Sequence, residues 1–252
     1  IPSDWIDVVV VADQPYQLEA LFTRDPQNIT ELQILMAMMA LKGIYAEHEV
    51  QSLNHGIGFN TAAIELLLPT YGETLGIKGK VAKNWVLNPH PTMIPAIESG
   101  WVESIHSFGG EVGMEKYIAA RPDVFFVGKD GTMRSNRALS QTAGQYAIDM
   151  FIGSTLQLDY QGNSSTVTKG RLSGFGGAPN MGHNPGGRRH STPAWQSLRD
   201  ETDPLAKGQK LVVQMVETYG SNKKPVFVET LDALAVQKQA GLANAPTVSY
   251  TH

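Results

Sequence analysis

Most residues whose types and spacing suit them to chemistry lie in one stretch of this chain, Leu172 to His190. It reads LSGFGGAPNMGHNPGGRRH and holds six glycines, two prolines and two adjacent arginines. Glycine lets other groups approach the main chain closely, and successive backbone N–H groups can form concave anion sites. Long irregular segments inside compact domains tend to be functional sites or linkers. We therefore interpret this segment as a binding loop rather than as a featureless surface loop.

Two kinds of group in this loop suit an anionic ligand. The backbone amides at Gly174, Gly176 and Gly177 are placed to bind a thioester oxygen or a phosphate. Arg188 and Arg189 follow a glycine pair, and guanidinium groups form bidentate pairs with carboxylates or phosphates. An isolated arginine pair is ordinarily a solvated surface feature. Its position at the end of this loop favours contact with an anion.

A second glycine turn is formed by His55-Gly56-Ile57-Gly58, between a predicted strand and a predicted helix. Such a turn needs glycine for geometric reasons alone, which is the structural interpretation. The functional interpretation is that the N–H groups of Ile57 and Gly58 point at a developing negative charge near a helix N-terminus. The turn is therefore our second candidate for oxyanion stabilisation.

Polar side chains also gather in KNWVLNPHP, which holds Asn84, Asn88 and His90 and which we place just after a strand. Asn-Pro is a turn signal, so a simple loop is one interpretation. The other is a set of polar groups that contact a substrate carboxylate. Asn180, in the glycine-rich loop, is a further candidate for substrate binding.

Several enzyme classes lack their signatures here. There is no GxxxxGK[ST] phosphate loop, no GxSxG elbow and no HExxH or close His/Asp/Glu set that suggests a metal. The GFGG at residues 174–177 is not the GxGxxG dinucleotide fingerprint. The chain has no cysteine, which excludes disulfides, thiolate metal sites and a cysteine nucleophile.

Composition indicates a globular protein. The 252 residues suit one large domain or two small ones, and 42% hydrophobic against 17% charged residues permits a sizeable core. A net charge of −4 gives no nucleic-acid footprint. The sequence contains no run of about 18 apolar residues, so it predicts no membrane span. Its start lacks the basic segment of a signal peptide. We expect a cytoplasmic location.

Strand and helix patterns alternate almost throughout the chain. The predicted strands cover residues 6–12, 81–87, 102–108, 124–127, 154–159, 211–217 and 226–229. The predicted helices cover residues 28–43, 61–68, 92–99, 112–120, 138–151 and 231–240. We expect Asn28 and Glu31 to form a capping box, Gly43 to close the first helix and Pro69 to stop the second.

This alternation predicts an α/β fold with an open, mostly parallel sheet flanked by helices. Ligands bind outside the carboxyl ends of the strands in such sheets. Because both glycine segments follow predicted strands, we expect residues 56–58 and 174–177 to converge on one reacting carbon.

Three segments in order resemble the acyl-CoA and acyl-carrier-protein transferases of the CoA-transferase superfamily. They are LNHGIGFNTAAIELLL (53–68), PAIESGWVESI (95–105), and STLQLDYQGN (154–163), which leads into SGFGGAPNMGHNPGGRRH (173–190). The order and spacing match over roughly residues 30–195. Within the superfamily, GFGGAPNMG followed by GGRRH is most similar to the alpha subunits of malonate decarboxylase. The alpha subunit of citrate lyase is a more distant resemblance.

The resemblance implies a CoA-transferase fold and an exchange of acetate for malonate on an acyl-carrier-protein thioester. It implies no tightly bound cofactor, because the phosphopantetheine-type arm of the carrier, derived from dephospho-CoA, is a substrate. Its implied partners are the carrier subunit and the decarboxylase subunits. Residues 1–24 would then be the tail of a preceding domain or a linker, and residues 25–252 a second CoA-transferase-like domain.

The same resemblance assigns roles to the candidate residues. Ile57, Gly58, Gly176, Gly177 and Asn84 are implied in catalysis, and Gly56 and Gly174 in binding the carrier arm. Asn88, His90, Asn180, Arg188 and Arg189 are implied in substrate binding.

The chain departs from the pattern at one point, because many CoA-transferases carry an attacking glutamate before the 92–99 helix. No glutamate lies between Glu73 and Glu98. We therefore expect the incoming carboxylate itself to be the nucleophile. Two alternatives stay open: a transferase or hydrolase that uses free CoA or resembles the citrate lyase subunit, and a non-catalytic assembly domain.

Overall fold

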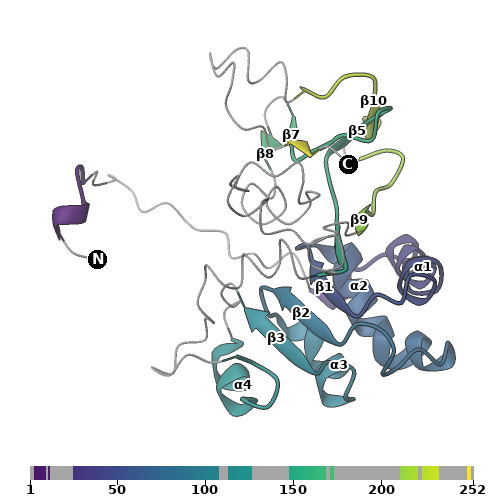
Figure 1. The fold of residues 1–252 in the computed structure, drawn as a ribbon. Coiled ribbons are helices and arrows are strands. Elements are labelled where there is room, and N and C mark those ends of the chain that lie inside the picture. Colours follow the sequence, from purple (N-terminus) through teal and green to yellow (C-terminus); the bar gives the residue numbers. More distant parts are fainter. Residues whose placement is uncertain are drawn as a thin grey trace, which may run out of the picture.

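A five-stranded parallel sheet forms the centre of the computed structural model (Figure 1). The structure describes residues 3–9, 11, 25–107, 113–126, 148–168, 171–172, 211–220, 223–232 and 249–250. The strands are β1 (Ser52–His55), β2 (Asn84–Leu87), β3 (Ser104–Ser107), β4 (Met150–Gly153) and β9 (Leu211–Gln214), in the order β3-β2-β1-β4-β9. Every pairing in this sheet is parallel, which confirms the predicted α/β class.

Four α-helices among the described residues accompany this sheet. They are α1 (Glu31–Ala40), α2 (Phe59–Leu67), α3 (Ile94–Glu98) and α4 (Glu115–Ala120). Helix α2 connects β1 to β2 and packs against α1, α3 and β4. The main core lies between these helices and the sheet, where Leu53 of β1, Trp85 of β2 and Ile105 of β3 are all fully buried. Parallel strands covered in this way are expected to be strongly apolar.

A second, four-stranded sheet has the order β10-β5-β6-β11. It consists of β5 (Gln157–Asp159), β6 (Ser164–Ser165), β10 (Phe227–Val228) and β11 (Ser249–Tyr250), and a separate pair is formed by β7 (Val167–Thr168) and β8 (Arg171–Leu172). Figure 1 shows β5, β7, β8 and β10 gathered above the parallel sheet, with β4 leading towards them. The strands predicted over residues 154–159 and 226–229 are thus confirmed in shortened form.

The cap of α1 differs from the prediction. Thr30 is the N-cap residue, its Oγ1 accepts a hydrogen bond from the Gln33 N–H at 3.2 Å, and the Gln33 side chain accepts one from the Thr30 N–H at 3.0 Å. The predicted box of Asn28 with Glu31 is therefore wrong. Asn28 instead ends a 3₁₀ turn, η2 (Pro26–Asn28), capped by the Asp25 side chain.

The helix end predicted at Gly43 is wrong, whereas the end predicted before Pro69 is correct for the α-helix alone, because helical chain continues beyond it in both cases. α1 continues into a π-helical turn, η3 (Leu41–Ala46), which passes through Gly43. α2 continues into a second one, η4 (Leu68–Gly72), which passes through Pro69. Pro69 has no N–H to donate to the preceding turn and would clash with a carbonyl at regular α-helical spacing, and the wider π-helical turn accommodates it.

Two further predicted elements are wrong where the structure describes them. Residues 6–9 and 11 form no strand, and Val8, Val9 and Val11 are largely exposed, because no described strand lies beside them. Residues 150–151, predicted as the end of a helix, belong to β4 and pair with β1. Of the strand expected over 124–127, the described residues form one isolated parallel bridge, between Phe125 and Ile105 of β3.

The helices expected over 92–99 and 112–120 are confirmed as α3, preceded by the 3₁₀ turn η5 (Pro91–Met93), and as α4. Residues 148–149, also within the helix expected over 138–151, are not helical, and its residues 138–147 and nearly all of the helix expected over 231–240 lie outside the described residues. No helix within the described ranges has the length and apolar character needed to cross a membrane.

Candidate functional site

The strand order reverses direction beside β1, because β2 and β3 follow on one side of it and β4 and β9 on the other. In open parallel sheets, ligands bind outside the carboxyl ends of the strands at such a switch point. Here the glycine turn after β1 lies at this position, together with Gly153 at the end of β4 and Ser154 directly after it. Asn60 links them, because its side-chain amide donates to Ser154 Oγ at 2.9 Å and to the Met215 carbonyl at 3.0 Å.

Glycine is favoured at position 56 because the chain there lies close to the backbone of β4. The Gly56 N–H donates to the Ile152 carbonyl at 2.7 Å, and a Cβ at this position would lie 3.0 Å from Gly153 Cα. A contact of that length is shorter than real Cβ atoms normally make. The predicted use of Gly56 in binding a carrier arm is therefore limited, since its N–H already has an acceptor.

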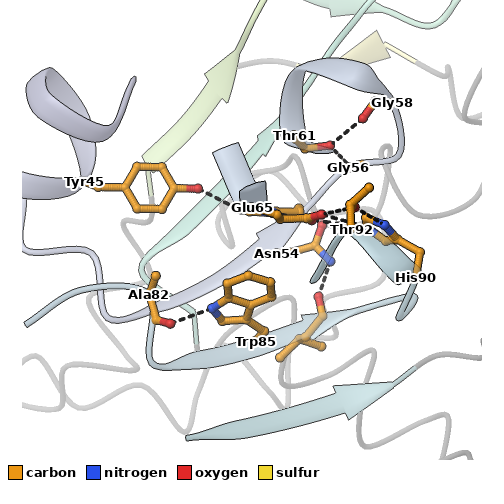
Figure 2. A network of polar contacts seen from close by, with 12 residues as sticks. Tyr45, Asn54, Gly56, Gly58, Thr61, Glu65, Ala82, Trp85, His90 and Thr92 are labelled. Atoms are coloured by element: carbon orange, nitrogen blue, oxygen red, sulfur yellow. Dashed lines mark hydrogen bonds and ion pairs between the residues drawn. The ribbon is translucent and has the colours of Figure 1, made fainter. Parts of the chain in front are cut away.

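The turn continues into the N-terminus of α2. Gly58 is the N-cap residue, with a φ of 133°, a backbone conformation that favours glycine. The Thr61 hydroxyl lies 2.6 Å from the Gly56 carbonyl and 3.1 Å from the Gly58 carbonyl, and so closes the turn (Figure 2). Ile57 and Gly58 are half-buried, and their N–H groups make no hydrogen bond with any described residue. These groups are thus available at the positive end of a helix dipole.

Asn88 lies at the same edge of the sheet, directly after β2, and is half-buried. Asn84 does not, because it begins β2 rather than following it. Three residues of strand separate it from that edge by about 10 Å. Its side chain accepts a hydrogen bond from Ser104 Oγ at 2.8 Å, and it lines a polar hollow beside Ser52 and Asp149, at the amino ends of the strands. The prediction that Asn84 joins Ile57 and Gly58 is wrong.

His90 follows Asn88 but points into the protein. The His90 ring is fully buried, with Nε2 3.0 Å from Glu65 Oε2 and Nδ1 beside the Thr92 hydroxyl. Both ring nitrogens therefore contact protein groups. Direct binding of a substrate carboxylate, the predicted role of His90, is not favoured by this geometry.

A buried polar cluster surrounds Glu65, and we define it as Tyr45, His55, Glu65, His90 and Thr92 (Figure 2). His55 Nδ1 lies 2.8 Å from Glu65 Oε1, and the Thr92 hydroxyl donates to Glu65 Oε2 at 2.7 Å. The Tyr45 hydroxyl lies 2.6 Å from His55 Nε2. Burial, with the nearby Glu65 carboxylate, raises the pKa of the Tyr45 phenol well above its ordinary value. The phenol therefore stays protonated beside His55 Nε2.

Sequence reasoning missed Glu65, Tyr45 and Thr92 as members of a site. A signal existed, because Glu65 interrupts the apolar run AAIELLL on a helix whose other neighbours are core residues. Charged residues are almost never fully buried without partners. Buried titratable clusters beside a cleft are candidates for functional roles.

The remaining predicted site residues cannot be placed. Gly174, Gly176, Gly177, Asn180, Arg188 and Arg189 lie outside the described residues. The predicted convergence of residues 56–58 and 174–177 therefore stays a prediction. Within the part of the chain that the structure describes, no group of three or more His, Cys, Asp or Glu residues is arranged to hold a metal ion.

Comparisons with known proteins identify related sequences and structures. The sequence matches the family described as "Malonate decarboxylase, alpha subunit, transporter" over residues 1–252. It is 62% identical to an acetyl-S-ACP:malonate ACP transferase of Malonomonas rubra, over 100% of this chain and 47% of that protein.

Two solved structures are also similar. A Pseudomonas malonate decarboxylase hetero-tetramer in complex with malonate has a chain 67% identical to this one, with a TM-score of 0.79 over 98% of this chain and 45% of that chain. The malonate decarboxylase alpha subunit of Acinetobacter baumannii is 66% identical, with a TM-score of 0.78 over 98% of this chain and 46% of that chain. The chain therefore spans about half the length of the relatives it matches. By its sequence over its whole length, and by its fold, the chain belongs to the malonate decarboxylase alpha subunit family.

Proposed function

We propose that this chain is part of an acyl-carrier-protein transferase that exchanges acetate for malonate on the carrier's thioester. The name of the Malonomonas rubra relative and the malonate complex of the Pseudomonas relative support this assignment. The observation that carries it is the pair of N–H groups at Ile57 and Gly58, which lie at the switch point without a described acceptor.

The reaction needs no nucleotide, because one thioester replaces another. A malonate carboxylate oxygen attacks the acetyl thioester carbon, the C–S bond breaks, and a mixed anhydride and the carrier thiolate result. The thiolate then attacks the malonyl carbonyl of the anhydride, forms the new C–S bond and expels acetate. Each step passes through a tetrahedral oxyanion, and no net proton is gained or lost.

The protein must therefore hold the reactants in register and stabilise two successive oxyanions. In our proposal, Ile57 and Gly58 donate their N–H groups to the oxyanion, and the amides of Gly176 and Gly177 supply further donors. Asn88 orients the attacking carboxylate from the same edge of the sheet. Arg188 or Arg189 neutralises the second malonate charge or a phosphate of the carrier arm.

The carrier arm in this proposal is a phosphopantetheine-type group derived from dephospho-CoA, and it acts as a substrate. Gly174 would contact it from the glycine-rich loop. The carrier subunit and decarboxylase subunits are the proposed partners, in line with the hetero-tetramer found for the Pseudomonas relative.

The test is acyl exchange by the full-length subunit with isotopically labelled malonate. We expect labelled malonyl thioester to form much faster from the acetyl-carrier thioester than from free acetyl-CoA. We also expect malonate to be preferred over citrate as the acyl acceptor. Equal use of free acetyl-CoA, together with a trapped glutamyl adduct, would identify a CoA-transferase instead. Absence of exchange on every thioester, with an intact complex, would support the assembly domain.

Two variants test the loop within the same assay. Gly176→Val should abolish exchange in a folded protein, because its side chain would block approach to the thioester. Alanine at both Arg188 and Arg189 should remove exchange but preserve assembly. Loss of assembly with normal exchange in the double variant would assign the arginines to an interface.

A further inference from the structure

We propose that Glu65 is a positioning residue for the exchange site, which fixes the turn after β1 relative to the loop after β2. This inference rests on the proposed function. Its carboxylate does not touch substrate in this scheme. It acts through His55 and His90, which lie next to the turn after β1 and the loop after β2. In our proposal these two segments contact the substrate.

The Glu65 carboxylate lies between the turn after β1 and the loop after β2. His55 ends β1 and directly precedes Gly56, and His90 is the second residue after Asn88. Glu65 Oε1 lies 2.8 Å from His55 Nδ1, and Glu65 Oε2 lies 3.0 Å from His90 Nε2. A single side chain on α2 thus joins the end of β1 to the loop after β2.

The cluster sets the orientation of each ring as well as its place. The Glu65 carboxylate can only accept, so His55 presents a proton on Nδ1 to it, and His55 Nε2 faces the Tyr45 hydroxyl. Glu65 and Thr92 contact opposite nitrogens of His90, which leaves that ring no freedom to turn. Trp85 covers the His55 ring at a centroid distance of 5.0 Å. Glu65, Tyr45 and His90 are fully buried.

This arrangement matters for rate because of where it lies. The N–H groups of Ile57 and Gly58 follow His55 by two and three residues. Misplacing catalytic groups by about 1 Å can lower a rate about 100-fold. The oxyanion donors gain strength only as charge develops, so their misplacement should lower kcat more than it raises KM.

The isosteric variant Glu65→Gln tests the proposal in the full-length subunit. A carboxamide carries its own N–H donors, so it cannot accept hydrogen bonds from His55, His90 and Thr92 together. We expect kcat for malonate exchange to fall about 100-fold per folded molecule, with KM changed less than about threefold. The matched control is Asp149→Asn, because the Asp149 carboxylate accepts from the Gln51 and Ser52 N–H groups at the amino edge. It should leave kcat unchanged.

A second readout does not depend on activity. In protein labelled with ¹⁵N at histidine, isoleucine and glycine, the wild type should show His55 protonated at Nδ1, and Glu65→Gln should lose that tautomer. The Ile57 and Gly58 amide signals should shift in the same variant and stay in place in Asp149→Asn. Unchanged amide signals with unchanged kcat would overturn the proposal.

A milder variant covers the case in which Glu65→Gln does not fold. Thr92→Val removes only the hydroxyl that joins Glu65 to His90, and it should lower kcat about tenfold while shifting the same amide signals. Normal kcat and unshifted amides in folded Thr92→Val would overturn the proposal in that case. If the wild type exchanges no acyl group, the proposed function fails, and the amide signals alone decide the positioning role.

Discussion

The close approach of β1 and β4 beneath the glycine turn makes Gly56→Ala an informative perturbation. An alanine Cβ would lie 3.0 Å from Gly153 Cα and 3.4 Å from the Ile152 carbonyl oxygen. Ordinary contact begins at 3.4 Å, so Gly153 and the turn must separate by a few tenths of an ångström. Both atoms belong to the backbone and cannot rotate away as a side chain would.

The expected size of the effect follows from two opposing terms. Overpacking at a tight site costs roughly 1–3 kcal/mol, and replacing glycine returns roughly 0.4–1 kcal/mol through the unfolded chain. The net destabilisation should therefore be about 1–2 kcal/mol, concentrated where the Gly56 N–H meets the Ile152 carbonyl.

Amide hydrogen exchange of the full-length subunit measures this locally. The amide of residue 56 should exchange roughly five- to thirtyfold faster in Gly56→Ala than in the wild type. This follows because about 1.4 kcal/mol corresponds to a factor of ten in an opening equilibrium. The control is Gly43→Ala, where a Cβ meets nothing within 4 Å and the backbone is helical. That variant should be more stable by about 0.5–1 kcal/mol. Equal protection of Gly56 in wild type and Gly56→Ala would refute the steric argument.

Three further predictions concern other parts of the fold. Thr30→Ala should destabilise the protein by about 1 kcal/mol in urea unfolding and Asn28→Ala far less, because Thr30 is the N-cap residue; equal losses would contradict this capping assignment. Tyr45 has a raised pKa in the folded state, so its contribution to stability is complete below about pH 10 and is lost as pH rises further. Unfolding free energy measured from pH 9 to 11 should fall less steeply in Tyr45→Phe than in wild type. Burial lowers the pKa of His106, so its contribution is present above about pH 6.5 and is lost as pH falls; His106→Gln should lose less stability than wild type between pH 7 and 5.

The fold class could be predicted from the sequence because strand and helix patterns alternate along most of the chain. The turn at Gly56 to Gly58 was also predictable. Glycines between a strand and a helix usually mark a turn that needs their conformational freedom. The parallel topology then places the turn and Asn88 at one edge of the sheet. Asn84 was misplaced because it lies within the strand predicted over 81–87, and only Asn88 and His90 follow the carboxyl end of that strand.

The cluster as a whole could not be predicted because its members are spread from Tyr45 to Thr92, although Glu65 within its apolar run was a signal for one of them. Only the packing of α2 against the sheet brings Tyr45, Glu65 and His90 together. The helix start at Thr30 was missed for a local reason. Asn28 and Thr30 both have capping side chains, and one of them had to be chosen without knowing where the helix packs.

The wide turn at Leu41–Ala46 has a consequence for how this family can tolerate length changes. Tyr45 lies inside that turn and reaches His55 from it. Deleting one residue there would restore regular α-helical spacing and rotate every later side chain on the helix by about 100°. The phenol would then face away from the imidazole, although no residue of the cluster itself had changed. Gene variants that delete a residue from this π-helical turn should therefore be rarer than variants that substitute a residue within it.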